Sequence, residues 1–258
     1  MTHFELQGLC VLNTRPLEQG KLLTRKIRRA GGNVICCPTL AIRPGSDNWI
    51  KNLPLLDTVN QAIFISANAV KYSLMSLHQQ HIQWPDDIHV IAIGQGTERA
   101  LLAHGIKVDA LPSKADSEHL LALPQLQYIE EQCILLFKGE GGRPLIAETL
   151  QARGASLLEL SVYSRQLPVI NRQSYERCWR NELVDIILFT SQQAMHNLFF
   201  LFGEQAYDWL RRTPCLVISE RLANDAALLG IQTILRCTPE TMMNALHHFK
   251  QGLIHERN

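Results

Sequence analysis

The sequence predicts an α/β protein built around parallel β-sheets, and three observations lead to this prediction. Short apolar runs rich in Val, Ile, Leu and Phe recur along the chain, and most are followed by a segment with helical periodicity. Apolar residues make up 46% of the 258 residues and charged residues 19%, which supplies material for buried cores and excludes a disordered chain. The length favours two compact units of about 100–150 residues each.

Ten apolar runs, each bounded by small or turn-forming residues, are predicted to be buried parallel strands. In chain order they are residues 9–13, 33–38, 61–66, 89–94, 107–111, 133–138, 156–163, 185–190, 215–219 and 232–237. The segments with helical periodicity are 21–31, 68–77, 97–105, 144–154 and 221–230, and several end in a glycine that can close a helix. Because strands and helices alternate, we expect the sheets to be parallel.

The two halves of the sequence resemble each other. The pairs that differ by 125 positions are Phe64 and Phe189, Ser66 and Ser191, Ile93 and Ile218, and Gly105 and Gly230. The earlier pairs, which differ by 123 positions, are Cys10 and Cys133, Arg15 and Lys138, and Gly31 and Gly154. A loop can absorb this two-residue slip. Two long copies predict paired domains, because a solenoid would contain many short repeats.

Two proline-containing stretches, 38–46 and 160–169, lie at equivalent places in the copies and are expected to be extended linkers. If the chain crosses between domains at both places, one domain contains both ends of the sequence and the other contains its middle. The alternative is a tandem arrangement with a break near residues 125–132. Periodicity does not decide between them, because it does not say which strands share a sheet.

The charge balance argues against several classes of partner. With 25 Lys+Arg against 24 Asp+Glu the formal charge is +1, so an anionic ligand has to be held locally, and we expect no nucleic-acid partner. The N-terminus lacks a secretory pattern and no apolar run approaches the ~18 residues that span a bilayer. We therefore expect a cytoplasmic monomer without a membrane partner. The seven cysteines, none spaced as C-x-x-C, are predicted to be reduced core residues.

The carboxyl ends of parallel strands are where α/β proteins bind ligands, so the residues there are the first candidates for a site. The loop 138–144, K-G-E-G-G-R-P, contains glycines whose backbone N–H groups can receive a carboxylate or phosphate. Pro144 is expected at the first position of the following helix. Since Pro144 replaces the third glycine of G-x-G-x-x-G, nucleotide binding is disfavoured, and a tight structural turn is the alternative to anion binding.

The equivalent loop of the other copy contains Arg15, which can form a bidentate pair with a carboxylate; a solvated arginine is the alternative. At the other strand ends, helix capping is the alternative to ligand binding. The candidates there are Ser66, Asn68, Gly94, Gly96, Thr97, Thr190, Ser191, Ser219 and Arg221. Neither G-x-S-x-G nor H-E-x-x-H occurs, so an enzyme of this kind would work mainly by holding its substrate in a productive conformation.

Eight short motifs, in their order along the chain, resemble those of the uroporphyrinogen-III synthase family, and the resemblance covers nearly the whole chain. They are T-R-P, S-x-N-A-V, A-I-G-x-x-T, S-E-x-L, K-G-x-x-G-R-x-L, V-Y-S, F-T-S and V-I-S-x-R-x-A. The resemblance implies two flavodoxin-like, doubly wound parallel-sheet domains joined by a two-stranded linker, with the active site between them. The implied domains are residues 1–38 with 168–258, and 44–162, and the implied linkers are 39–43 and 163–167.

The resemblance also implies the reaction. Hydroxymethylbilane, a linear tetrapyrrole, loses its terminal hydroxyl as water and closes to uroporphyrinogen III with ring D inverted, without a cofactor or metal. The family's functional tyrosine falls on Tyr163, the expected proton donor; a weak acid suffices because the pyrrole nitrogen assists the departure of the hydroxyl. The alternative for Tyr163 is aromatic packing between linker and domain.

The substrate is a polycarboxylate, and the resemblance implies which residues bind it. They are Arg15, Ser66, Asn68, Thr97, Lys138, Gly139, Arg143, Ser191, Ser219 and Arg221. Leu222 stands where some family members have a threonine, so a hydroxyl at that place is not essential in this chain.

A second class of function stays open, a two-lobed protein that closes on a sugar or other small ligand without catalysis. A sugar-binding protein is expected to place tryptophans in its cleft. The four tryptophans fall outside the predicted strand-end loops, at Trp49, Trp84, Trp179 and Trp209. Arginine and lysine in the loops of both copies favour the enzyme, and the broken glycine pattern disfavours a nucleotide-dependent transferase.

Overall fold

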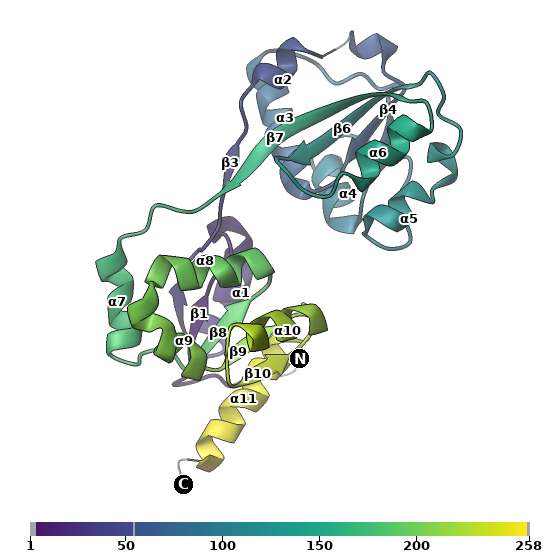
Figure 1. Ribbon diagram of the computed structural model, residues 1–258. Helices are drawn as coiled ribbons and strands as arrows, with labels where there is room; N and C mark the ends of the chain where they lie inside the picture. The colour runs from purple at the N-terminus through teal and green to yellow at the C-terminus, as the bar shows by residue number, and fades with distance from the viewer. Residues whose placement is uncertain (1–3, 54, 257–258) are drawn as a thin grey trace. The chain divides into compact units, whose positions relative to one another are not determined.

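The computed structural model describes residues 4–53 and 55–256 (Figure 1). The chain divides into two compact units, which we call unit 1 and unit 2. Unit 1 contains Met1–Ala41 and Gln166–Asn258, and unit 2 contains Ile42–Arg165. Each unit has its own five-stranded sheet, so each is described by itself.

The sheet of unit 1 has the order β10-β9-β8-β1-β2, and its strand pairs are parallel. The strands are β1 Cys10–Asn13, β2 Asn33–Cys36, β8 Ile186–Phe189, β9 Cys215–Val217 and β10 Ile234–Arg236. The helices are α1 Leu17–Arg29, α7 Arg172–Arg180, α8 Gln192–Phe202, α9 Tyr207–Arg212, α10 Glu220–Leu228 and α11 Met242–Glu256, with a 3₁₀ turn η3 Glu204–Ala206. Numbered within the unit, the strand order is the 2-1-3-4-5 order of flavodoxin-like folds.

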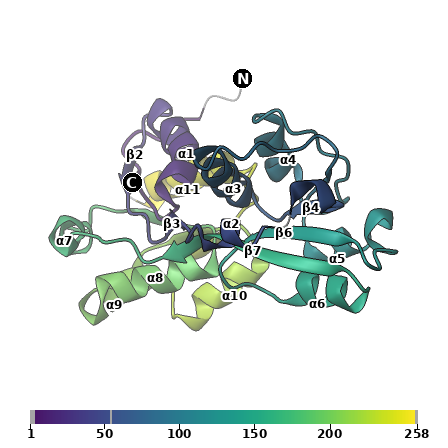
Figure 2. The same ribbon diagram turned by 90° about the horizontal axis from the view of Figure 1, so that it is seen from above.

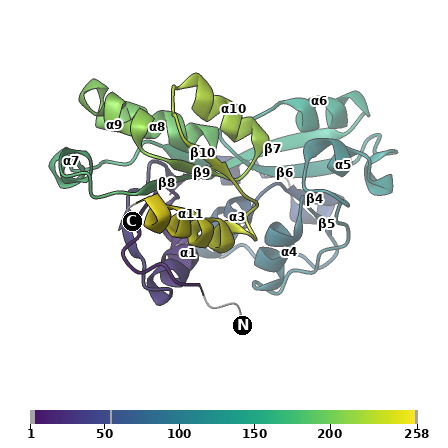
Figure 3. The same ribbon diagram turned by 90° about the horizontal axis from the view of Figure 1, so that it is seen from below.

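Helices cover both faces of this sheet (Figure 3). Alternate residues of β8 point to opposite faces, so Ile186 and Leu188 pack with α1 and α11, whereas Ile187 and Phe189 pack with α8, α9 and α10. All four side chains are completely buried. Burial on both faces explains why the strand sequences are continuously apolar rather than alternating.

The sheet of unit 2 has the order β3-β7-β6-β4-β5, and its pairs β4–β5, β4–β6 and β6–β7 are parallel. The strands are β3 Ala41–Pro44, β4 Gln61–Phe64, β5 His89–Ala92, β6 Cys133–Gly139 and β7 Ser156–Gln166. The helices are α2 Asn48–Lys51, α3 Ala67–Gln79, α4 Gln95–Leu102, α5 Ser117–Leu121 and α6 Leu145–Ala152, with 3₁₀ turns η1 Leu56–Thr58 and η2 Pro124–Leu126.

Unit 2 repeats the same layering (Figure 2). Phe64 and Phe137 stack with ring centroids 4.5 Å apart and pack with α3, while Ile63 and Leu136 face α5 and α6. Two buried cores, one on each face, therefore hold the sheet in place.

The predicted strand 107–111 is wrong, because this segment makes only an isolated parallel bridge between Ala110 and Ile91. The carboxylate of Asp109 accepts a hydrogen bond of 2.9 Å from the Val90 N–H, so a side chain takes a place that a backbone carbonyl would occupy in a ladder. The stretch around β3, expected only to be extended, forms an edge strand, and Gly45 N–H donates to the Val162 carbonyl at 2.9 Å.

The repeated halves of the sequence correspond to equivalent elements. β4 and β6 take the places in one sheet that β8 and β1 take in the other. Four glycines that lie at repeated positions follow helices in the left-handed region, with φ between 77° and 85°: Gly31, Gly105, Gly154 and Gly230. A side chain in this backbone conformation is strained, so the repeat preserves the helix ends through glycine.

Among the described residues, no helix is both long enough and apolar enough to cross a membrane.

Candidate active site

The central strands of each sheet end in the loops where the sequence places its candidate residues. In unit 2 these are the ends of β4 and β6, the pair equivalent to strands 3 and 1 of a flavodoxin-like sheet. Strand order reverses between these two strands, and ligands of open α/β sheets bind at this point of reversal. The two units are taken in turn.

Tyr163 lies in β7 beside the end of β6 and is only 1% exposed. The pairing between β6 and β7 shifts at Lys138 and Gly139, which places Gly139 opposite Tyr163. A Cβ atom on Gly139 would lie 2.6 Å from Cζ and 3.0 Å from the hydroxyl oxygen of Tyr163. The tyrosine ring therefore occupies space that exists only because residue 139 has no side chain.

The Tyr163 hydroxyl accepts two hydrogen bonds. Ser66 Oγ donates one at 3.2 Å, and Arg165 Nη2 donates the other at 3.0 Å. Ser66 is also the N-cap of α3, where its Oγ accepts a bond of 3.0 Å from the Ala69 N–H. A hydroxyl that accepts two bonds can still donate one, so Ser66, Tyr163 and Arg165 form a group that can pass on a proton.

The two cations of the loop 138–144 are already paired with carboxylates. Lys138 Nζ lies 2.6 Å from Glu159 Oε2, whereas Arg143 lies 3.6 Å from Glu118 with its side chain 78% exposed. An exposed pair of this kind is weak, so Arg143 can exchange its partner for another anion more easily than Lys138 can. Pro144 is the N-cap residue of α6, so the prediction that it is the first helical residue is off by one position.

The remaining candidates of unit 2 lie in the first turns of helices. Asn68 is half-buried at the start of α3, beside Ser66. Thr97 is buried in the first turn of α4, whose N-cap is Gly94. A Cβ on Gly94 would lie 2.7 Å from the Ala115 Cβ, so this glycine permits a close approach of two loops, whereas Gly96 faces open space.

In unit 1, Arg15 follows β1 in a loop that Asn13 pins to α1. Asn13 Oδ1 accepts a hydrogen bond from the Arg15 N–H at 3.2 Å, and its Nδ2 donates to Thr24 Oγ1 at 3.1 Å. The Nε of Arg15 is buried and makes no hydrogen bond to any described residue, and burial lowers the pKa of this guanidinium. This Nε can therefore donate to an anion that enters the loop.

Arg15 lies in a hollow of about 440 Å³ with three more cations from α1, namely Lys21, Arg25 and Arg28. Lys21 pairs with Glu18 at 2.6 Å, whereas Arg25 and Arg28 form no ion pair within the described part of the chain. None of these three residues is among the candidates from the sequence, although their spacing at 21, 25 and 28 places them along one side of a helix. The hollow is suited to an anion with one or more carboxylates.

Two of the four other candidates of unit 1 are helix caps. Ser191 caps α8 by accepting from the Ala194 N–H at 3.1 Å, and Ser219 caps α10 by accepting from the Leu222 N–H at 3.3 Å. Thr190, just before Ser191, is half-buried. Arg221 is exposed, with Nη1 3.5 Å from Gln192 Oε1.

Leu222 is 2% exposed in unit 1. It stands where some members of the family that this chain resembles have a threonine. Its side chain is part of the apolar core. This position therefore contributes packing rather than a hydroxyl in this chain.

Comparison with known proteins gives a consistent result over most of the sequence. The family model described as "Uroporphyrinogen-III synthase HemD" matches residues 21–246. The chain is 32% identical over 230 residues to a uroporphyrinogen-III synthase of Escherichia coli K12, covering 88% of this chain and 94% of that protein. It is 34% identical over 184 residues to that of Proteus mirabilis, covering 69% and 92%.

Solved structures share the fold at lower identity. A mutant uroporphyrinogen III synthase from the extremely thermophilic bacterium Thermus thermophilus matches with a TM-score of 0.64 and 18% identity, covering 96% of this chain and 99% of that one. The enzyme from Helicobacter pylori 26695 matches with a TM-score of 0.59 and 16% identity, covering 95% and 99%. These matches and the two parallel sheets confirm the predicted α/β fold class. The family model that matches residues 21–246 and the relative from Escherichia coli establish that the chain belongs to the uroporphyrinogen-III synthase family.

Proposed function

We propose that the chain catalyses the cyclisation of hydroxymethylbilane to uroporphyrinogen III, a lyase reaction of haem and tetrapyrrole biosynthesis that releases water and inverts ring D. The match of the family model to residues 21–246 carries this proposal. The same match disfavours a ligand-binding protein without catalysis, because relatives that this chain covers almost completely are named as synthases.

Substrate binding is assigned to anion-binding groups in both units. In unit 1 the Arg15 hollow would take one or more carboxylates, with the Arg15 guanidinium forming a bidentate pair with one of them. In unit 2 the backbone N–H groups of the glycine-rich loop and Arg143 would take others. Lys138 contributes less directly, since Glu159 already neutralises its charge.

Smaller contacts are assigned to the strand-end residues. Asn68 and Thr97 in unit 2, and Ser191, Ser219 and Arg221 in unit 1, are proposed to donate hydrogen bonds to the substrate. A capping serine accepts a bond from a backbone N–H and keeps its own proton, so capping and substrate binding are compatible in one side chain.

The proton for the leaving hydroxyl is assigned to Tyr163. As the pyrrole nitrogen pushes out the hydroxyl, the C–O bond breaks and the oxygen takes a proton to leave as water. Because Tyr163 is buried and Ser66 is half-buried, we place Ser66 between Tyr163 and the leaving oxygen. In the ligand-free chain Ser66 Oγ donates to the Tyr163 oxygen, so both hydroxyl protons turn when substrate binds: Ser66 gives its proton to the leaving oxygen and receives one from Tyr163.

The group then has to return to its starting state. Arg165, 3.0 Å from the Tyr163 oxygen, stabilises the phenolate that forms. When the new carbon–carbon bond forms at ring D, the pyrrole carries one extra proton. The pyrrole loses this proton to the phenolate, which restores Tyr163. The sum is one substrate converted to one macrocycle and one water.

The two units are proposed to be the domains 1–38 with 168–258, and 44–162, joined through residues 39–43 and 163–167. Two hydrogen bonds of Thr39 support a connection that begins here: its Oγ1 donates to the Ala194 carbonyl at 3.0 Å, and its carbonyl accepts from Asn197 Nδ2 at 2.8 Å. These bonds fix the chain to α8 two residues before β3 begins. We also propose that the enzyme acts as a cytoplasmic monomer.

The decisive experiment gives the purified full chain freshly prepared hydroxymethylbilane, oxidises the products and separates the porphyrin isomers by chromatography. The proposal predicts a large excess of the type III isomer over an enzyme-free control, in which head-to-tail closure gives type I. An isomer ratio equal to that of the control would overturn the proposed function.

A further inference from the structure

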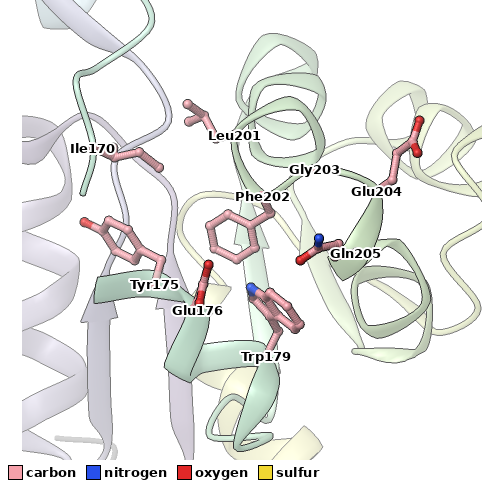
Figure 4. Close-up of a pocket in the computed structure, with 9 residues that line it drawn as sticks. All are labelled: Ile170, Tyr175, Glu176, Trp179, Leu201, Phe202, Gly203, Glu204 and Gln205. Atoms are coloured by element: carbon pink, nitrogen blue, oxygen red, sulfur yellow. The ribbon is translucent and has the colours of Figure 1, made fainter. Parts of the chain in front are cut away.

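A second hollow lies within unit 1, and none of the described side chains that line it is cationic. It encloses about 410 Å³ between α7, the end of α8 and η3 (Figure 4). The rings of Tyr175, Trp179 and Phe202 line it together with Glu176, Glu204 and Gln205. An aromatic and acidic lining is the reverse of the basic hollow around Arg15, so the two hollows suit ligands of opposite charge.

The aromatic wall is held in place by contacts on its outer side. Tyr175 and Phe202 stack with centroids 6.2 Å apart, and Phe202 stacks on Trp209 at 6.1 Å. The Tyr175 hydroxyl donates to the Cys36 carbonyl at 3.3 Å. Phe202 is the last residue of α8, which ends at Gly203 with φ of 76°. The wall is therefore formed before any ligand binds.

Glu176 is the acidic group best placed to meet a ligand. In Figure 4 its carboxylate lies between Tyr175 and Trp179, and the amide of Gln205 points toward the same space, whereas Glu204 points away. Arg180 pairs with Glu176 at 3.3 Å, but the two side chains are 56% and 40% exposed, so this pair is weak. Arg180 also lies over the Trp179 ring at 4.8 Å, yet it does not line the hollow.

We propose that this hollow binds a small organic cation with an ammonium or guanidinium head and an apolar body. The head would lie against the aromatic rings and donate hydrogen bonds to the Glu176 carboxylate, while the body packs on Phe202 and Leu201. The volume lies in the range of small-molecule sites. A polycarboxylate is repelled by Glu176 and Glu204, so this site is separate from substrate binding and does not rest on the proposed reaction.

Binding of 2-phenylethylammonium to the full chain, measured by isothermal titration calorimetry, tests the proposal. The neutral analogue 2-phenylethanol and the anionic 3-phenylpropanoate have a similar apolar body and serve as ligand controls. The expected result is saturable binding of the cation, about tenfold or more tighter than the neutral analogue, with the anion weakest. Equal affinity for the cation and the neutral analogue overturns the proposal.

Three variants locate the site. Glu176→Gln is expected to bring the affinity for the cation down to that for the neutral analogue, and Phe202→Leu to weaken both. Asp208→Asn removes an exposed carboxylate outside the lining and is expected to change neither. Far-UV circular dichroism confirms that each variant is folded. If Glu176→Gln binds the cation as tightly as the unaltered chain, the proposal is wrong, whatever the isomer assay shows.

Discussion

Substitution of Tyr163 by phenylalanine tests the centre of the proposed mechanism. The change keeps the buried ring and removes only the hydroxyl that accepts hydrogen bonds from Ser66 and Arg165. Ser66 keeps its capping bond to Ala69, and the exposed guanidinium of Arg165 can be solvated again, so a cost of about 1–2 kcal/mol in the free energy of unfolding is expected. Turnover should fall roughly tenfold to a hundredfold, which is below or at the lower end of the usual contribution of a general acid.

The assay is the initial rate of hydroxymethylbilane consumption at saturating substrate, with KM measured in parallel. KM should change little, because the lost group acts on the leaving oxygen and not on the carboxylates. Tyr128→Phe is the matched control, since Tyr128 is 92% exposed and its loss of a hydroxyl should leave turnover unchanged. Unchanged turnover in Tyr163→Phe would remove this residue from the mechanism.

The route through Ser66 is tested by Ser66→Asn, which keeps a capping oxygen for α3 and removes the hydroxyl. If the proton passes through Ser66, this variant and Tyr163→Phe interrupt the same path, and the double variant should be about as slow as the slower single variant. Multiplied effects in the double variant would mean that the two hydroxyls act independently.

Four further outcomes are expected. Gly139→Ala should displace the Tyr163 ring, because the new Cβ would lie 2.6 Å from its Cζ. We expect the free energy of unfolding, measured with heat or denaturant, to fall by about 1–3 kcal/mol and turnover to become slower. Gly252→Ala is the control, because no atom lies within 4 Å of its new Cβ, and it should reduce neither stability nor turnover. Arg15→Met should raise KM by about tenfold or more, because it removes the guanidinium proposed to bind a substrate carboxylate; an unchanged KM would exclude Arg15 from substrate binding. Burial raises the pKa of Asp109, but hydrogen bonds from the Val90 N–H and Lys107, together with the nearby charges, outweigh it and hold the pKa below its usual range. A carboxylate with a lowered pKa stabilises the fold at pH values above its unfolded-state pKa. The free energy of unfolding should therefore fall as the pH is lowered through the folded-state pKa, and it should fall by less in Asp109→Asn. Dialysis against EDTA should leave turnover unchanged, because the proposed steps use only proton donors and anion-binding groups of the chain, and a loss restored by added metal would contradict them.

Local physical chemistry made much of the fold predictable from the sequence. Nine of the ten predicted runs contain strands, because short, continuously apolar runs between turn-forming residues suit a sheet that is covered on both faces. Gly31 and Gly154 mark helix ends through a backbone conformation that other residues rarely adopt, and Ser66 and Ser191 mark helix starts through their capping oxygens. Each of these signals acts within a few residues of the chain.

Contacts between distant residues decided the rest. The segment 107–111 has the composition of a strand, but the Val90 N–H donates to the Asp109 carboxylate. Composition does not show whether a side chain or a backbone carbonyl will accept that hydrogen bond. Periodicity could not assign strands to sheets, whereas pairing joins β1 to β8 across more than half of the chain.

The candidate site divides in the same way. The motifs identified Tyr163, Arg15 and the glycine-rich loop as candidates from the sequence alone. Only the folded chain shows that Gly139 makes room for the Tyr163 ring, that Arg165 reaches its hydroxyl, and that Lys138 is neutralised by Glu159. The physical reason is that residue type fixes what a group can do, whereas distance and burial fix what it meets, and these depend on segments that are far apart in the sequence.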